Sequence, residues 1–443
     1  MKFNEYKHLD LTKIAEEILA FWKAANIFEQ SIASREGAIP FVFFEGPPSA
    51  NGVPGIHHVM ARSIKDIFCR YKTQKGFQVK RKAGWDTHGL PVELGVEKEL
   101  GITKEDIGKK ISVEDYNKAC KEAVMRYTDI WNDLTEKIGY WVDMEDPYIT
   151  YKPKYMESVW WLLKQLYNKQ LLYKGYTIQP YSPKAGTGLS SHELNQPGCY
   201  RDVSDTTVVA QFKVKALAAA ASKALGNPTA PIHILAWTTT PWTLPSNTAL
   251  AVGKEIDYVL VKTYNQYTFE PITIIIGKPL LAKQFGKKFV EGDAQALATY
   301  TPESKTIPYQ VLGECKGADL VGTTYEQLIP WCAPAENADQ AFRVIAGDFV
   351  TTDDGTGIVH IAPTFGADDA RVAKEYGVPP MLVKDAHGNL IPLVDLQGKF
   401  IEGHNIPEAF AGKYIKNEYY DAGQAPEKSW DVSLAILLKE ENK

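Results

Sequence analysis

The sequence contains few cysteines and no long hydrophobic run. Its five cysteines stand far apart and form no C-x-x-C pair, a pattern that indicates neither a disulfide framework nor a structural zinc site. No apolar segment approaches the roughly 18 residues of a membrane-spanning helix, and the N-terminal segment mixes charged with apolar residues, unlike a secretory signal. We therefore expect a cytoplasmic protein without a membrane segment.

An excess of charge of one sign is also lacking. The 443 residues include 49 Lys+Arg and 54 Asp+Glu, a formal net charge of -5, and 44% of them are hydrophobic. Disorder is excluded, and a nucleic acid would have to be bound by a local basic patch. The candidate patch, which could equally be a solvated helix face, comprises Arg62, Lys65, Arg70, Lys72, Lys75, Lys80, Arg81 and Lys82.

The order of apolar and turn residues predicts an α/β protein with a β-rich part. Residues 41–46 predict a strand, 57–76 a helix closed by Gly76, and the next segment a second strand, as in a parallel sheet with its ligand crevice at the strands' carboxyl ends. From about Val208, short Val/Ile/Thr-rich runs predict β structure, and the alanine run at 216–221 predicts a solvent-side helix within it. We expect a helical extension at 1–40, capped by Asp10 or Thr12, an α/β part at 41–204, a β-rich insertion at 205–425 and a helix at 426–443.

The segment GPPSANGVPGIHH (46–58) lies between the first predicted strand and helix. Free backbone N–H groups at a helix start favour an anion, although the segment matches neither G-x-G-x-x-G nor the P-loop pattern. Taken alone, it could be a Pro/Gly-rich turn with His57 and His58 as surface or capping residues, and Asp86 in GWDTHGLPVE (84–93) could simply form a turn.

Together these two segments resemble the first half of the class I aminoacyl-tRNA synthetases, and the isoleucine-specific members fit best. The resemblance implies the first half of a Rossmann-like catalytic domain with an inserted β-rich editing domain. It further implies that the amino-acid site includes Gly46, Pro47, Trp85 and Asp86, with the Pro47 carbonyl and the Asp86 carboxylate on the substrate's α-ammonium. ATP, with Mg²⁺, would meet Gly55, His57 and His58.

The sequence departs from this family at two signatures. Where the family has His, any residue, Gly, His, this chain has Gly55-Ile56-His57-His58, so the first and third positions are exchanged. Either the site is rearranged yet active, which we favour, or it binds ATP poorly. The family's Lys-Met-Ser-Lys-Ser loop is absent, as expected if the chain is an N-terminal fragment. Amino-acid activation by these residues alone should then be weak or absent.

Two segments of the β-rich part resemble the editing domain of the same family. They are WTTTPWTLPSN (237–247) and GTGIVHIAPTFGADDARVAKEYG (355–377), which by themselves could be ordinary β residues and first-turn helix acids. The resemblance implies that Asp369 anchors the α-ammonium of a mischarged amino acid and that His360 shapes a valine-sized pocket. A water and the ester would be positioned by Thr238, Thr239, Thr240 and Asn247.

The sequence therefore predicts a monomeric isoleucine–tRNA ligase fragment whose partners are isoleucine, ATP and tRNA(Ile), with hydrolytic editing of valyl-tRNA(Ile). No Ser-His-Asp or Cys-His arrangement is evident, so hydrolysis would depend on a positioned water. Two alternatives remain open: a stand-alone deacylase of mischarged tRNA, and a non-catalytic tRNA-binding paralogue. Three assays distinguish these possibilities. Pyrophosphate exchange marks the ligase, deacylation marks the hydrolase, and tRNA binding without either activity marks the paralogue.

Overall fold

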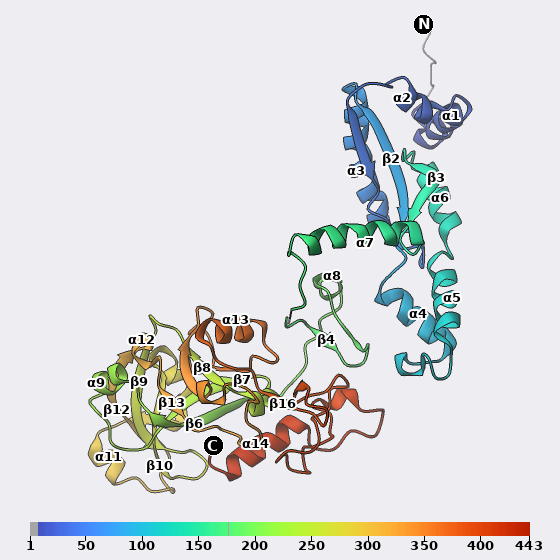
Figure 1. Ribbon diagram of the computed structural model, residues 1–443. Helices are drawn as coiled ribbons and strands as arrows, with labels where there is room; N and C mark the ends of the chain where they lie inside the picture. Colours follow the sequence, from blue (N-terminus) through green and yellow to red (C-terminus); the bar gives the residue numbers. More distant parts are fainter. Residues whose placement is uncertain (1–7, 176) are drawn as a thin grey trace. The chain divides into compact units, whose positions relative to one another are not determined.

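The computed structural model describes residues 8–175 and 177–443 of the chain (Figure 1). The chain forms two compact units, Met1–Gly175 and Tyr176–Lys443. Each unit has hydrophobic clusters of its own, and no cluster of described residues combines side chains from both. No helix in the described part of the chain is both long and apolar enough to cross a membrane.

A three-stranded parallel sheet forms the centre of the first unit. Strand β1 (Pro40–Phe44) pairs with β2 (Gln78–Trp85), which pairs with β3 (Asp143–Ile149). Helix α3 (Ile56–Gln74) connects β1 to β2, and Gly76 follows it with a φ of +91° that favours glycine. The predicted strand–helix–strand unit is confirmed. Its parallel strands place the turns after β1 and β2 at one edge of the sheet.

Six further α-helices and one 3-10 helix belong to the described part of this unit. Asp10 is the N-cap of helix α1 (Leu11–Ala24), and its side chain accepts a hydrogen bond from the backbone N–H of Lys13 at 3.1 Å, so the predicted Asp10 cap is confirmed. The other helices are α2 (Ile27–Ala33), α4 (Leu90–Leu100), the 3-10 helix η1 (Lys104–Asp106), α5 (Val113–Val124), α6 (Thr128–Lys137) and α7 (Pro153–Asn168).

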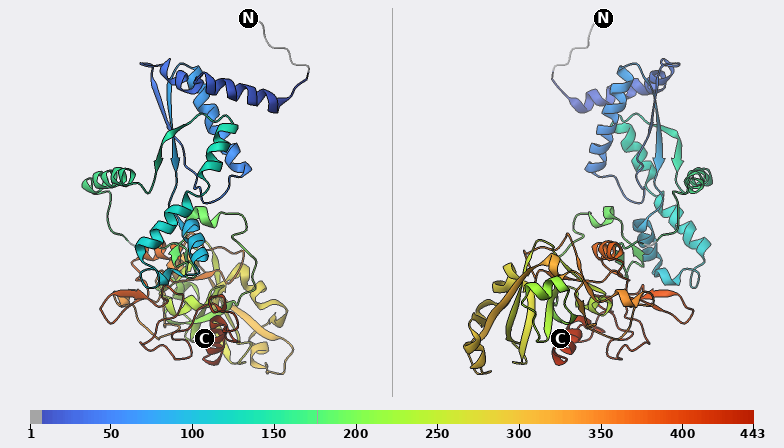
Figure 2. Two further views of the ribbon diagram at one scale, coloured as in Figure 1. Left: turned by 90° about the vertical axis from the view of Figure 1, so that its right-hand side faces the viewer. Right: turned by 60° about the vertical axis from the view of Figure 1, so that its left-hand side comes forward.

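The second unit is built on a large mixed sheet. Within the described residues the strand order is β11-β12-β9-β10-β7-β15-β8-β14-β13-β6, and β6 also pairs with β7, so six of the strands close into a ring. Figure 2 shows these strands side by side. They are β6 (Val208–Ala216), β7 (Ile232–Thr238), β8 (Ala249–Val252), β9 (Asp257–Tyr264), β10 (Pro271–Gly277), β11 (Phe289–Glu291), β12 (Ile307–Lys316), β13 (Thr324–Tyr325), β14 (Arg343–Ala346) and β15 (Ile358–Ile361).

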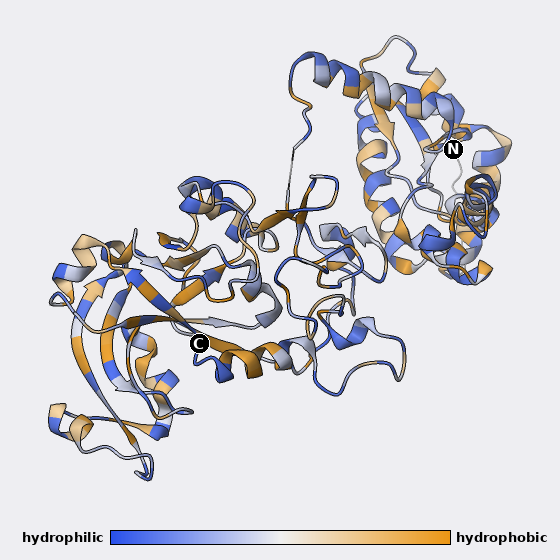
Figure 3. Cartoon of the chain, turned by 60° about the horizontal axis from the view of Figure 1, so that its bottom comes forward, coloured by the Kyte–Doolittle hydropathy of each residue, from blue (hydrophilic) through white to orange (hydrophobic). Residues whose placement is uncertain are grey.

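Short helices and hairpins complete this unit. Hydrophobic residues concentrate on the sheet strands and on the last helix (Figure 3). Two hairpins pair β4 (Tyr181–Ser182) with β5 (Thr187–Gly188) and β16 (Leu382–Lys384) with β17 (Leu390–Pro392). The helices are α8 (Ser191–Leu194), α9 (Ala219–Ala224), α10 (Leu281–Phe285), α11 (Ala294–Ala298), α12 (Gly317–Leu320), α13 (Ala367–Tyr376) and α14 (Trp430–Glu440), with 3-10 helices η2 (Pro241–Ser246), η3 (Lys278–Leu280), η4 (Gly286–Lys288), η5 (Ala338–Gln340) and η6 (Asn417–Tyr419).

One local prediction is wrong in part. We expected residues 216–221 to form a solvent-side helix, but α9 begins three residues later, at Ala219, and Ala221 is fully buried in the core. An alanine run carries no polar face, so the sequence alone does not reveal which side packs inward. The predicted domain boundaries at 40/41, 204/205 and 425/426 stay predictions.

Candidate functional site

The two motifs of the first unit meet at the carboxyl end of the sheet. The backbone N–H of Asp86 donates to the carbonyl of Pro48 at 3.0 Å, which joins the turn after β1 to the turn after β2. The first turn is also held from the α6 side, where the indole N–H of Trp131 donates to the Gly52 carbonyl at 2.8 Å. Gly46, Pro47 and Asp86 are thus brought together, as the sequence predicted for one site.

Asp86 has the surroundings of a carboxylate available to a cation. It is half-buried, and its side chain accepts a long hydrogen bond of 3.4 Å from the backbone N–H of His88. Among the described residues it forms no ion pair within 4.0 Å. Trp85 instead faces the interior, packed with Ala50, Trp131 and Ile149. Trp85 therefore supports the turn from behind, and its predicted contact with substrate stays a prediction.

The exchanged positions, Gly55 and His57, lie at the start of α3 together with His58. Gly55 is the N-cap, and its backbone N–H donates to Nδ1 of His58 at 2.9 Å. The His57 ring folds back beside Gly55: a Cβ on residue 55 would lie 2.8 Å from its Cε1. Burial, together with His57 and Arg62, lowers the pKa of His58, so its imidazole is neutral at pH 7. The His57 imidazole thus occupies space next to the position where the family signature has its first histidine.

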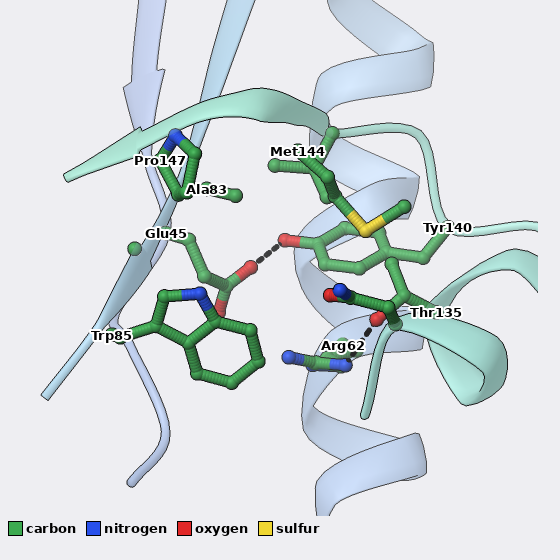
Figure 4. Close-up of a pocket in the computed structure, with 11 residues that line it drawn as sticks. Glu45, Arg62, Ala83, Trp85, Thr135, Tyr140, Met144 and Pro147 are labelled. Carbon is green, nitrogen blue, oxygen red and sulfur yellow. Dashed lines mark hydrogen bonds between the residues drawn. The ribbon is translucent and has the colours of Figure 1, made fainter. Parts of the chain in front are cut away.

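Beneath the motifs lies a buried polar cluster that the sequence did not single out. Glu45, just before Gly46, is buried and forms contacts with Lys65 and the hydroxyl of Tyr140. Arg62 donates to Thr135 Oγ1 at 2.7 Å and faces the same cavity of about 70 Å³ (Figure 4). Burial raises the pKa of Tyr140, so its phenol remains a neutral donor to the carboxylate. The cluster fixes the end of β1.

The predicted basic patch is wrong for Arg62 and Arg81, which are buried, and three further members are paired with carboxylates. Arg62 lies in the buried cluster, Arg81 is buried against Asp66 at 2.9 Å, and Arg70 contacts the same carboxylate at 2.5 Å. Lys65 pairs with Glu45, and Lys82 pairs with Asp146 at 2.6 Å. Arg62 thus bonds to a threonine and the other four cations pair with carboxylates, of which only Asp66, four positions before Arg70, stands near its partner in the sequence.

In the second unit, the predicted editing segments line one pocket of about 900 Å³. Thr238, at the end of β7, accepts a hydrogen bond from the backbone N–H of Thr240 at 3.0 Å. Asp369, in the first turn of α13, accepts one from the backbone N–H of Ala362 at 2.8 Å. Burial raises the pKa of Asp369, and Thr239 also lines the pocket. Hydroxyls and a partly desolvated carboxylate therefore face one space.

A directional chain of hydrogen bonds leads from the core to this pocket. The hydroxyl of fully buried Tyr325 donates to Asn247 Oδ1 at 2.8 Å, and Asn247 Nδ2 lies 3.4 Å from His360 Nδ1. His360 Nε2 lies 2.8 Å from Thr243 Oγ1, which donates to the Thr240 carbonyl. Since the Asn247 amide donates to His360 Nδ1, this nitrogen carries no proton. The proton of His360 is therefore on Nε2, which donates to Thr243.

Within this series of hydrogen bonds, His360 lines the pocket itself, whereas Asn247 supports it from behind. His360 lines the pocket, and burial lowers its pKa to about 4, so it is neutral at pH 7. Asn247 is buried behind it, outside the pocket lining, and therefore reaches the pocket through His360. No role was predicted for Tyr325, which stands in no motif, or for Thr243, which lies within the segment 237–247. In the described part of the chain, no three His, Cys, Asp or Glu side chains are grouped to hold a metal ion.

The sequence is similar to a known family and to curated relatives. The family model "tRNA synthetases class I (I, L, M and V)" matches residues 17–377. The chain is 60% identical to the isoleucine–tRNA ligase of Porphyromonas gingivalis, a match that covers 100% of this chain and 39% of that protein. It is 46% identical to the isoleucine–tRNA ligase of Clostridium tetani, over 90% of this chain and 34% of that protein. The chain thus spans about two fifths of the length of the former relative.

One matching solved structure is distantly similar in sequence. A ternary complex of Agrobacterium radiobacter K84 agnB2 LeuRS with tRNA and LeuAMS covers 84% of this chain and 44% of that one, at 16% identity and a TM-score of 0.33. That score is too low to relate the two folds in detail. The family match, in contrast, extends over most of the chain and includes both candidate sites. The chain belongs to the class I tRNA synthetases of the isoleucine, leucine, methionine and valine group.

Proposed function

We propose that the chain carries the first half of the amino-acid activation site of an isoleucine–tRNA ligase together with its editing pocket. In the activation reaction, the carboxylate of isoleucine attacks the α-phosphorus of ATP and pyrophosphate leaves. Asp86 and the Pro47 carbonyl bind the α-ammonium, since a half-buried carboxylate without an ion-pair partner among the described residues suits a cation. His57 and His58 lie at the N-terminus of α3, which favours phosphates.

ATP is the nucleotide of this family, and we propose that Mg²⁺ arrives bound to its phosphates as part of the substrate. The accepting tRNA is tRNA(Ile), and the active protein is a cytoplasmic monomer. All five cysteines are free, which suits a reducing compartment. Of the predicted basic stretch, Lys75 and Lys80 stay exposed and form no ion pair with any described carboxylate within 4.0 Å, and they are the remaining candidates there for phosphate contacts.

The editing proposal depends on the pocket of the second unit. Isoleucine and valine differ by one methylene, which a hydrophobic pocket distinguishes by only about 1–3 kcal/mol, a general figure for such pockets. A second, hydrolytic pocket adds the missing discrimination. Its Thr hydroxyls position water and ester, while Asp369 binds the α-ammonium. The observation that carries this proposal is the convergence of Thr238, Thr240, His360 and Asp369 on one space.

Hydrolysis of valyl-tRNA(Ile) by this chain, with D369A beside D368A, tests the editing proposal. Asp368 is exposed next to Asp369 and lies outside the pocket lining, so D368A is the matched control. We expect D369A to lose about tenfold or more in kcat/KM through the lost charge-assisted contact, and D368A to hydrolyse like the native chain. Equal activity of native chain and D369A would contradict the role of Asp369.

A stand-alone deacylase is the second candidate, because the whole pocket lies within one compact unit. Pyrophosphate exchange in a chain extended to the length of its relatives separates the two. Exchange that depends on isoleucine supports the ligase, and hydrolysis without any exchange supports the deacylase.

A further inference from the structure

Asp431 is a buried carboxylate that the chemistry proposed above does not use. It is the second residue of α14, and its side chain is 1% exposed. One oxygen accepts a hydrogen bond from the backbone N–H of Trp242 at 2.7 Å, and the other meets the ammonium of Lys416 at 2.7 Å. A carboxylate with so little access to water is costly unless every oxygen has a partner, and here both have one.

The hydrogen bond to Trp242 reaches the wall of the pocket. Trp242 belongs to η2, the short helix that follows the threonine-rich end of β7. One residue further, Thr243 contacts His360 at 2.8 Å, and the Trp242 ring packs edge-on against Phe365 with centroids 4.8 Å apart. Phe365 and His360 both line the pocket. A displacement of η2 would therefore move two sides of the pocket together.

Asp431 is itself held firmly. The neighbouring Trp430 is buried and stacks on Phe400 at 4.8 Å, so the start of α14 is fixed in the hydrophobic core. Lys416 also pairs with Asp205 at 2.6 Å, three residues before β6. The Lys416 ammonium thus links the segment before β6 with the start of α14.

We propose that Asp431 is a positioning residue of the pocket, which sets the place of Thr243 and His360 by holding the Trp242 backbone N–H. This inference rests on the proposed hydrolytic function. What the pocket needs from residue 431 is a rigid hydrogen-bond acceptor, and Lys416 offsets the charge that this acceptor carries. An uncharged acceptor in the same place should then preserve the geometry, provided that the lysine is removed with the charge.

The test compares two double variants, K416M/D431N and K416M/D431L. Both lack the ion pair, and asparagine and leucine have nearly the same shape, so both should fold. They differ in the acceptor for Trp242. In hydrolysis of valyl-tRNA(Ile), we expect K416M/D431N to stay within about threefold of the native kcat and K416M/D431L to fall about 100-fold with KM nearly unchanged, the effect of misplacing reacting groups by about 1 Å.

Amide hydrogen exchange at Trp242 supplies a second readout that needs no hydrolysis. We expect slow exchange in the native chain and in K416M/D431N, and fast exchange in K416M/D431L, because only the last lacks the acceptor. If the native chain does not hydrolyse the substrate, the proposed function fails while the exchange comparison still decides the role of Asp431. Equal kcat values of the two variants, or equal exchange at Trp242, would overturn the inference.

Discussion

At the scale of single residues, the buried imidazole of His360 should make the protein sensitive to acid. Its folded pKa of about 4 lies below the ordinary value of 6.5. The unfolded chain therefore takes up a proton before the folded one does as the pH falls, and stability is lost between about pH 6.5 and pH 4. Above this window His360 is neutral in both states and contributes no pH dependence.

H360Q should remove this part of the acid sensitivity. Between pH 7 and pH 5 we expect the unfolding free energy of the native chain to fall by about 2 kcal/mol more than that of H360Q, because only the native chain has the histidine to protonate. Urea denaturation at both pH values measures the difference. All other groups are shared, so equal losses would show that the pKa of His360 is not lowered.

Tyr325 tests the hydrogen-bond chain behind His360. Y325F leaves the buried Asn247 Oδ1 without its 2.8 Å donor, which should lower the unfolding free energy by about 1–3 kcal/mol. The ¹⁵N chemical shifts of the His360 ring report the tautomer directly. We expect a protonated Nε2 and an unprotonated Nδ1 in the native protein. The opposite pattern would contradict the proposed direction of the hydrogen bonds from Tyr325 to Thr243.

At the scale of elements, the start of α3 decides how the exchanged signature works. The His57 ring fills the space beside Gly55, so a side chain at position 55 requires the ring to leave. G55A alone should therefore disturb the site, whereas the double substitution G55H/H57G exchanges the two groups without a clash.

We expect G55H/H57G to leave adenylate formation within about tenfold of the native level, because the imidazole is moved and not added. Pyrophosphate exchange in a chain extended to its relatives' length measures this. A large gain would mean that the native site is crippled by the exchange of the two positions.

Elements in which apolar residues recur with a clear helical or strand spacing were predictable from the sequence. The β1–α3–β2 unit follows from an apolar run, a Gly/Pro turn and an amphipathic stretch, and the Asp10 cap follows from its position before a periodic segment. The basic patch failed mainly at contacts between distant residues. Arg62 and Lys82 find their partners Thr135 and Asp146 more than 60 positions away, and only in the folded chain.

The candidate sites show the same limit. Family motifs identified Asp86, His360 and Asp369, and the structure brings the members of each motif pair together. The supporting residues Glu45, Tyr325 and Asp431 stand in no local pattern. Each becomes important through one partner more than 70 positions away, at Tyr140, Asn247 and Trp242 respectively.

At the scale of the whole molecule, the two units should unfold separately. Trp131 belongs to a cluster of the first unit, and Phe212 to the main cluster of the second. We expect two thermal transitions, with W131A lowering one of them and F212A the other, since emptying such a core site costs about 3–5 kcal/mol. Calorimetry of both variants checks this. A single transition shifted by either variant would contradict independent cores.

The ratio of the rates at which the native chain hydrolyses valyl-tRNA(Ile) and isoleucyl-tRNA(Ile) tests the editing assignment most directly. A pocket that accepts valine and rejects one additional methylene should favour the valyl substrate by about 10–200-fold in kcat/KM. A ratio in that range supports the assignment of the second unit as an editing site. Equal rates for the two substrates, or hydrolysis of neither by the folded chain, would contradict it.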